Sequence, residues 1–73
     1  MNYSKVYNDL FNQIGADEWK KRSIARGELY NNYGFCPDIT RIKIIESPED
    51  MIRFEVGRHV YEYTYGGNLA KVE

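Results

Sequence analysis

The stretch MIRFEVGRHVYEYTY at residues 51–65 constrains the fold more than any other part of the chain. Apolar and polar side chains alternate on both sides of Gly57-Arg58, and this period of two is typical of strands with one buried face. A glycine followed by one further residue suits the type II′ turn of a two-residue hairpin. The sequence therefore predicts a β-hairpin that turns at Gly57-Arg58.

The turn also determines which side chains share a face of the hairpin. Counting outward from it places Phe54 opposite Tyr61, and on the other face it places Arg53 opposite Glu62. We expect the apolar face to lie beneath a helix, which makes its tyrosines a wall of the core. The same ladder would stack on nucleic-acid bases if the face were open. This face carries Ile52, Phe54, Val56, Tyr61, Tyr63 and, at its exposed rim, Tyr65.

A third strand is predicted before the hairpin. The stretch ITRIKII at residues 39–45 alternates, and the SPED that follows shortly after it has the composition of a turn. We expect Ile44 to lie opposite Ile52. Ile42 then lies opposite Phe54, so the new strand joins the apolar face of a three-stranded antiparallel meander.

The first half of the chain is predicted to form two helices. Residues 3–14 place their apolar side chains on one arc of a helix, and Gly15 suits the left-handed residue that ends it. A second helix is expected to begin near Asp17, to be weakened at Gly27 and to end before Gly34.

Together these elements predict one small α+β domain over residues 1–73, in the order α-α-β-β-β. The first helix is expected to dock on the apolar face of the sheet through Val6, Leu10 and Ile14, because it has no other apolar surface to cover. The second helix is expected to pack at an edge of the sheet through Trp19.

Charge and cysteine content narrow the class of protein. Ten basic and eleven acidic residues give a net charge of −1, so no overall attraction to nucleic acid or anionic membranes is expected. The single cysteine, Cys36, forms no internal disulfide, which favours a reducing compartment. The opening stretch is too polar for a secretory signal, and no apolar run reaches the ~20 residues that span a bilayer. We therefore expect a cytoplasmic protein without membrane contact, in the host cytoplasm if the chain is phage-encoded.

The stretch EWKKRSIAR at residues 18–26 is the most suggestive of a binding surface. A basic helix with an aromatic residue among its arginines binds phosphates and stacks on bases. Alternatively, Trp19 belongs to the core with the stems of Arg22 and Arg26 along it, and this interpretation is favoured. Basic side chains on the outer face of the sheet and an exposed tyrosine add to the set. The candidate partner-binding residues are Trp19, Lys20, Lys21, Arg22, Arg26, Arg41, Lys43, Arg53 and Tyr65.

No group of side chains has the spacing of a catalytic or metal site. His59 is the only histidine, and Cys36 has no obvious His–Asp companion, so we expect a non-enzyme without cofactor or metal. Glu46, Glu49 and Asp50 would hold a cation only weakly, and turn formation explains them equally well.

The first ten residues, MNYSKVYNDL, resemble the opening of some phage-encoded HNH homing endonucleases. The paired histidines of that family's catalytic motif are absent from this sequence, so the resemblance implies a phage or mobile-element origin and no activity. The leading expectation is a small non-catalytic protein-binding module that inhibits a host or defence protein by occupying its surface. The alternative is a nucleic-acid-binding domain that uses the basic helix from Trp19 to Arg26, and an enzyme ranks third.

Overall fold

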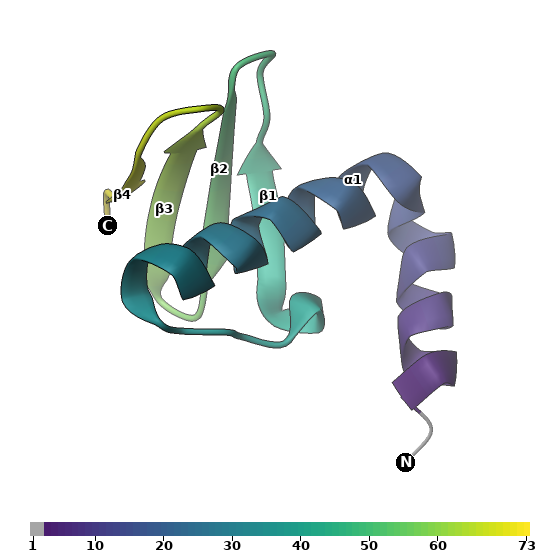
Figure 1. Cartoon of the computed structure of the whole chain (residues 1–73). Coiled ribbons are helices and arrows are strands. Elements are labelled where there is room, and N and C mark those ends of the chain that lie inside the picture. The colour runs from purple at the N-terminus through teal and green to yellow at the C-terminus, as the bar shows by residue number, and fades with distance from the viewer. Residues whose placement is uncertain (1–2) are drawn as a thin grey trace.

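The structure is a computed structural model that describes residues 3–73 as one helix followed by a four-stranded sheet (Figure 1). This arrangement confirms the α+β class. All neighbouring strands are antiparallel, in the order β1-β2-β3-β4. The elements are α1 (Tyr3–Tyr33), a short 3-10 helix η1 (Ile39–Arg41), β1 (Ile42–Glu46), β2 (Met51–Val56), β3 (His59–Thr64) and β4 (Leu69–Lys71).

Where the sequence predicts two helices, the structure has a single helix, α1, with a sharp kink at Gly15. Gly15 has φ 86° and ψ 167°, a backbone conformation that glycine alone adopts readily. The chain is therefore helical on both sides of Gly15 but changes direction there, as Figure 1 shows. We call residues 3–14 the N-terminal arm and residues 16–33 the long segment.

The β2–β3 hairpin has the predicted register. Phe54 lies opposite Tyr61 on one face, and on the other face Arg53 lies opposite Glu62. A type II′ turn requires a positive φ at its first central residue and a negative φ at its second. Gly57 has φ 62°, and φ of Arg58 is not positive, because no non-glycine residue of the described chain has a positive φ. The alternating sequence and its turn were therefore sufficient to define this hairpin.

The pairing of β1 with β2 differs from the prediction by two residues. Ile44 lies opposite Phe54 instead of Ile52. A bulge between Ile44 and Glu46 takes up one residue of β1 and places Glu46 opposite Arg53, with which it forms an ion pair of 2.9 Å. Because the shift is an even number of residues, Ile42 and Ile44 stay on the predicted apolar face, whereas Ile45 is exposed.

The fourth strand, β4, is absent from the three-stranded prediction. The chain turns back at Gly66, which has φ 72°, and Leu69 then lies opposite Tyr63. The three residues of β4 are too few to show an alternating pattern, so the strand could not be predicted from periodicity. Leu69 packs against the core, so β4 widens the apolar face of the meander.

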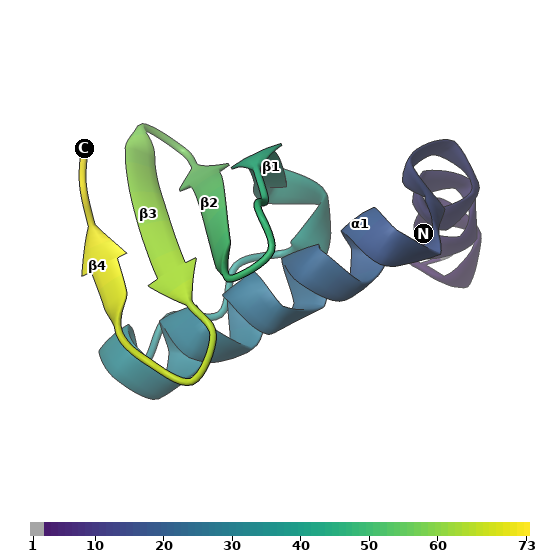
Figure 2. The ribbon, with the colours of Figure 1, turned by 90° about the horizontal axis from the view of Figure 1, so that it is seen from above.

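The long segment of α1 covers one face of the sheet, and no other element of residues 3–73 covers the opposite face (Figure 2). Ala25 and Leu29 of the helix are fully buried. Tyr61 and Tyr63 are 8% and 9% exposed, which confirms that they line the core. The buried cluster consists of Ala25, Leu29, Ile42, Ile52, Phe54, Val56, Tyr61 and Tyr63.

The prediction that the first helix docks on the sheet is wrong. The N-terminal arm stands beyond the β1 side of the sheet in both views (Figures 1 and 2). Val6 is 41% exposed, and Leu10 and Ile14 lie outside the buried cluster. The physical reason is the kink at Gly15, which turns the arm away from the line of the long segment.

The arm instead contacts Trp19 at the beginning of the long segment. The ring centroids of Tyr7 and Phe11 lie 6.0 and 5.8 Å from that of Trp19, and both pairs have an edge-to-face arrangement. The expectation that the second helix packs at a sheet edge through Trp19 is therefore also wrong. The helix packs on the sheet through the small Ala25 and through Leu29, and Trp19 joins the two halves of α1.

The end of α1 follows the sequence signals better than its middle does. Gly27 does not interrupt the helix, which continues to Tyr33. Gly34 has φ 69°, and its N–H donates to the Tyr30 carbonyl at 2.9 Å, as in a left-handed C-terminal cap.

Replacing Gly27 by alanine is expected to stabilise the protein by about 0.5–1 kcal/mol. The backbone at Gly27 is helical, and an added Cβ would meet nothing within 4 Å. Alanine has less freedom to lose on folding, so the free energy of unfolding should rise. Urea unfolding should give a higher midpoint for Gly27→Ala, whereas a lower one would show that this position requires glycine.

Candidate functional site

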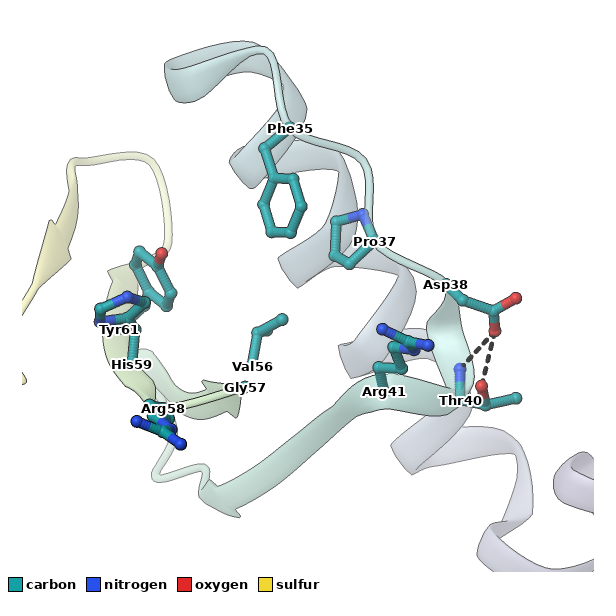
Figure 3. A pocket seen from close by; sticks show the side chains of 10 residues that line it. All are labelled: Phe35, Pro37, Asp38, Thr40, Arg41, Val56, Gly57, Arg58, His59 and Tyr61. Carbon is teal, nitrogen blue, oxygen red and sulfur yellow. Dashed lines mark hydrogen bonds between the residues drawn. The ribbon is translucent and has the colours of Figure 1, made fainter.

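A cavity of about 580 Å³ lies where the chain leaves α1 and where β2 turns into β3 (Figure 3). In an antiparallel meander, the start of β1, the end of β2 and the start of β3 meet at one end of the sheet. The loop after α1 leads to this same end (Figure 1). The walls of the cavity therefore come from residues 35–41 and 56–61, which are distant in sequence.

Part of the cavity wall is apolar. Phe35 and Pro37 project toward it from the loop, and Val56 lies across from them (Figure 3). Tyr61 is 8% exposed, and its ring stacks on Phe54 with the centroids 5.4 Å apart, so the core holds it in place. Phe35 is 46% exposed. An apolar group entering the cavity would meet a fixed wall on one side and an accessible aromatic ring on the other.

The hydroxyl of Tyr61 is neutral at physiological pH. Burial raises the pKa of Tyr61 above its ordinary value of 10.0, and the neighbouring Tyr33 adds to the effect. The two rings lie 6.0 Å apart. Tyr61 therefore adds no charge to the cavity that it lines.

Two arginines border the cavity. Arg41 ends η1 and Arg58 lies in the hairpin turn, and neither forms an ion pair within residues 3–73. By contrast, Arg22 and Arg53 each pair with a glutamate at 2.9 Å. The cavity thus has two guanidinium groups that form no ion pair with the residues that the structure describes.

Asp38 is the acidic residue among those that line the cavity, and it is already hydrogen-bonded. It accepts from the backbone N–H of Thr40 at 2.9 Å and from the Thr40 hydroxyl at 2.7 Å. The Tyr7 hydroxyl also donates to it, at 3.4 Å. These hydrogen bonds, above all the one from the Thr40 backbone, hold the pKa of Asp38 below its ordinary value of 3.8. Figure 3 shows the carboxylate turned toward Thr40.

Replacing Asp38 by alanine should cost about 1 kcal/mol at neutral pH, because Asp38 is the N-cap of η1. The folded-state pKa lies below that of the unfolded chain, so the charged carboxylate stabilises the fold above pH 3.8. This contribution disappears as the pH falls through the lowered folded-state value. Urea midpoints of wild type and Asp38→Ala should therefore differ at neutral pH and converge in acid. A difference that persists in strong acid would contradict the assigned role of the charge.

The structure separates the side chains of the basic stretch in α1. Lys20 is exposed, whereas Lys21 forms an ion pair with Asp17 at 2.8 Å. Arg22 is 8% exposed and donates to the Ile39 carbonyl at 3.4 Å, which ties the long segment to η1. Of the two lysines in this stretch, Lys20 is therefore the one that is exposed to solvent.

Trp19 and Arg26 have different surroundings. Trp19 is half-buried against the N-terminal arm. The Arg26 Nε donates to the Cys36 Sγ at 3.2 Å, beside a smaller cavity of about 250 Å³. The two side chains therefore do not stand together as the aromatic and the cation of one stacking surface.

Of the predicted residues outside α1, Arg41 is the one that borders the larger cavity. Lys43 is exposed on the outer face of the sheet. Arg53 lies on the same face between two glutamates and pairs with both. Tyr65 is 41% exposed, with its ring edge-on to Tyr63 at 5.8 Å.

The sequence-based set missed Phe35, Arg58 and His59, all of which line the larger cavity. No single segment marks them, because the cavity forms only when the loop after α1 meets the hairpin turn. The signal that could have found them is topological. Any residues that directly precede β1 lie at the same end of the meander as the β2–β3 turn.

Two further findings describe residues 3–73. No three or more His, Cys, Asp or Glu side chains gather there in a group that could hold a metal ion. In the same part of the chain, no helix combines the length and apolar character needed to cross a membrane.

Comparison with known proteins gives no match: no protein-family model, no curated protein and no solved structure matches this chain.

Proposed function

We propose that the chain is a small non-catalytic module that binds another protein at the end of the fold that holds the larger cavity. We name this surface the aromatic–arginine pocket and define it by Phe35, Arg41, Arg58 and Tyr61. The observation that carries the proposal is the exposed ring of Phe35 on a cavity that Arg41 and Arg58 also line, where neither arginine forms an ion pair within residues 3–73. Aromatic residues and arginine are the side chains most enriched at the energetic centres of protein interfaces.

Two exposed aromatic side chains at the end of α1 support a surface larger than the cavity itself. The ring of Tyr33 lies 6.0 Å from that of Tyr61 in the pocket, and Tyr30 lines the smaller cavity. Tyr30 and Tyr33 are 60% and 53% exposed and lie at the end of α1, directly before the loop that carries Phe35. Single exposed apolar side chains are common on proteins, whereas several in one short stretch are typical of contact surfaces. These tyrosines would form the margin of an interface centred on the pocket.

Inhibition is the proposed consequence of binding. A module of this size acts on a partner by covering part of its surface, which requires no chemistry of its own. The resemblance of the first ten residues to phage-encoded proteins supports a host or defence protein as the target.

The proposal is tested by capturing partners from cell extract with tagged wild-type chain, Phe35→Ala and Tyr65→Ala. Phe35 and Tyr65 are similarly exposed, at 46% and 41%, but Tyr65 lies outside the pocket. Wild type and Tyr65→Ala should retain the same protein, and Phe35→Ala should lose it. Retention by Phe35→Ala at the wild-type level would exclude the pocket as the binding surface.

Nucleic-acid binding is the competing function, and a heparin or DNA column at low salt distinguishes it. Phosphate binding weakens steeply with salt. We expect the wild-type chain to pass through without retention, because several of its cations already pair with carboxylates. Tight, salt-sensitive retention that Lys20→Glu abolishes would favour the basic helix as a nucleic-acid surface.

A further inference from the structure

We propose that the aromatic–arginine pocket takes a short acidic peptide segment of the partner, with an apolar side chain flanked on both sides by carboxylates. This inference rests on the proposed function and specifies the chemistry of the partner. It follows from the size of the cavity, from its apolar wall and from the position of its charges.

The size of the cavity favours a short segment over a folded surface. Its volume of about 580 Å³ lies within the range of roughly 300–1,000 Å³ that is typical of small-ligand sites. Such a space takes one large side chain with the adjoining backbone. A broad interface alone would leave it unfilled.

The apolar wall requires that the central side chain be apolar. Phe35 projects toward the cavity from the loop, and Val56 and Tyr61 face it from the strands (Figure 3). Val56 and Tyr61 are each 8% exposed and belong to the core, so these two residues need no rearrangement to receive a ligand. An aromatic or large aliphatic side chain would fill the space between them and Phe35.

The charges require carboxylates on either side of that side chain. Arg41 and Arg58 border the cavity from opposite sides in Figure 3. A guanidinium group binds a carboxylate through two parallel hydrogen bonds, and neither arginine has such a partner within residues 3–73. Asp38 would oppose an acidic ligand, but its carboxylate is turned to Thr40, from which it accepts two hydrogen bonds.

A nucleic acid would present phosphates to the same arginines, but the surroundings favour a peptide. An extended phosphate chain needs a track of cations. Lys21 and Arg53 would add little to such a track because they pair with carboxylates, and the exposed Lys43 lies on the outer face of the sheet. Two isolated arginines beside an apolar cavity match a few carboxylates better than a polyanion.

The test is fluorescence anisotropy with a labelled, end-blocked peptide of sequence Gly-Asp-Asp-Phe-Asp-Asp-Gly. Matched probes replace every Asp by Lys, or Phe by Ala, and a short single-stranded oligothymidylate represents nucleic acid. Wild-type chain should bind the first probe, and each substituted peptide should bind at least about tenfold more weakly, as should the oligonucleotide.

Charge-neutralised variants locate the site. Arg41→Gln and Arg58→Gln should each weaken binding about tenfold, because each removes a charge-assisted hydrogen-bonding partner. Lys43→Gln is the matched control, since Lys43 is exposed and forms no ion pair within residues 3–73 but lies on the outer face of the sheet. It should leave affinity within about twofold of wild type. Circular dichroism should confirm that all variants remain folded.

Equal binding of the Lys peptide, stronger binding of the oligonucleotide, or an equal loss with Lys43→Gln would overturn the inference. So would no binding of the acidic peptide by a folded wild-type chain. These outcomes leave the proposed function standing if Phe35→Ala still loses the captured partner protein. Retention of that protein by Phe35→Ala would instead refute the pocket as the binding surface.

Discussion

Leu29→Ala is expected to destabilise the protein by about 2–5 kcal/mol, the largest effect of any single change considered. Leu29 is fully buried between the long segment of α1 and the sheet. Its removal leaves a cavity in the centre of a core that a chain of 73 residues cannot easily rearrange. Small domains have little stability to lose, so a substantial fraction of the Leu29→Ala molecules should be unfolded even without denaturant. Urea unfolding followed by circular dichroism measures the effect.

Leu10→Ala provides the matched control for Leu29→Ala. It is the same substitution in the same helix, but Leu10 lies in the N-terminal arm, outside the buried cluster. The loss of stability should therefore be clearly smaller than for Leu29→Ala. Equal losses at the two positions would mean that the arm, and not the long segment alone, contributes to the core.

Gly15→Ala is expected to cost about 1–3 kcal/mol or to straighten α1. An added Cβ would meet nothing within 4 Å, so the penalty comes only from φ 86° and ψ 167°, which alanine does not adopt without strain. Alanine strongly favours helical backbone, and a continuous helix would swing the arm away from Trp19. The rings of Tyr7 and Phe11 would then no longer shield Trp19.

Trp19 is the only tryptophan, so its fluorescence reports directly on the arm. Gly15→Ala should shift the emission to longer wavelength, as the indole becomes exposed to water. Gly27→Ala, in the helical middle of α1, should leave the emission unchanged. Unchanged emission together with a higher unfolding midpoint for Gly15→Ala would contradict the kink.

The hairpin could be predicted because local and long-range requirements agree there. Phe54 and Tyr61 share a face through alternation alone, and Gly57 fixes the register between their strands. The same reasoning gave a register for β1 that is wrong by two residues. No tight turn fixes the pairing of β1 with β2, and a bulge after Ile44 changes the register.

The pattern of apolar side chains in α1 does not indicate which half of the helix covers the sheet. The N-terminal arm has the cleaner stripe, whereas the buried face of the long segment includes Arg22 beside Ala25 and Leu29. Arg22 is tolerated there because it pairs with Glu18 and donates to the Ile39 carbonyl. Ala25 contributes little to an apolar pattern, yet its small side chain allows the helix to approach the sheet closely.

The candidate site could be predicted only in part, for a related reason. Arg41 was among the predicted binding residues, but Phe35 and Arg58 come from a loop and a turn whose sequences carry no binding motif. Their proximity results from the meander, which brings the start of β1 and the β2–β3 turn to one end of the sheet. Pattern within a segment does not contain that information.

The most direct test of the account is amide chemical-shift mapping of the isotope-labelled chain as the captured partner protein is added. If the aromatic–arginine pocket binds the partner, the largest shifts should fall in residues 35–41 and 57–61. Residues 3–14 and the outer face of the sheet around Lys43 should change little. Largest shifts in the basic stretch around Lys20, with residues 35–41 unaffected, would contradict the account.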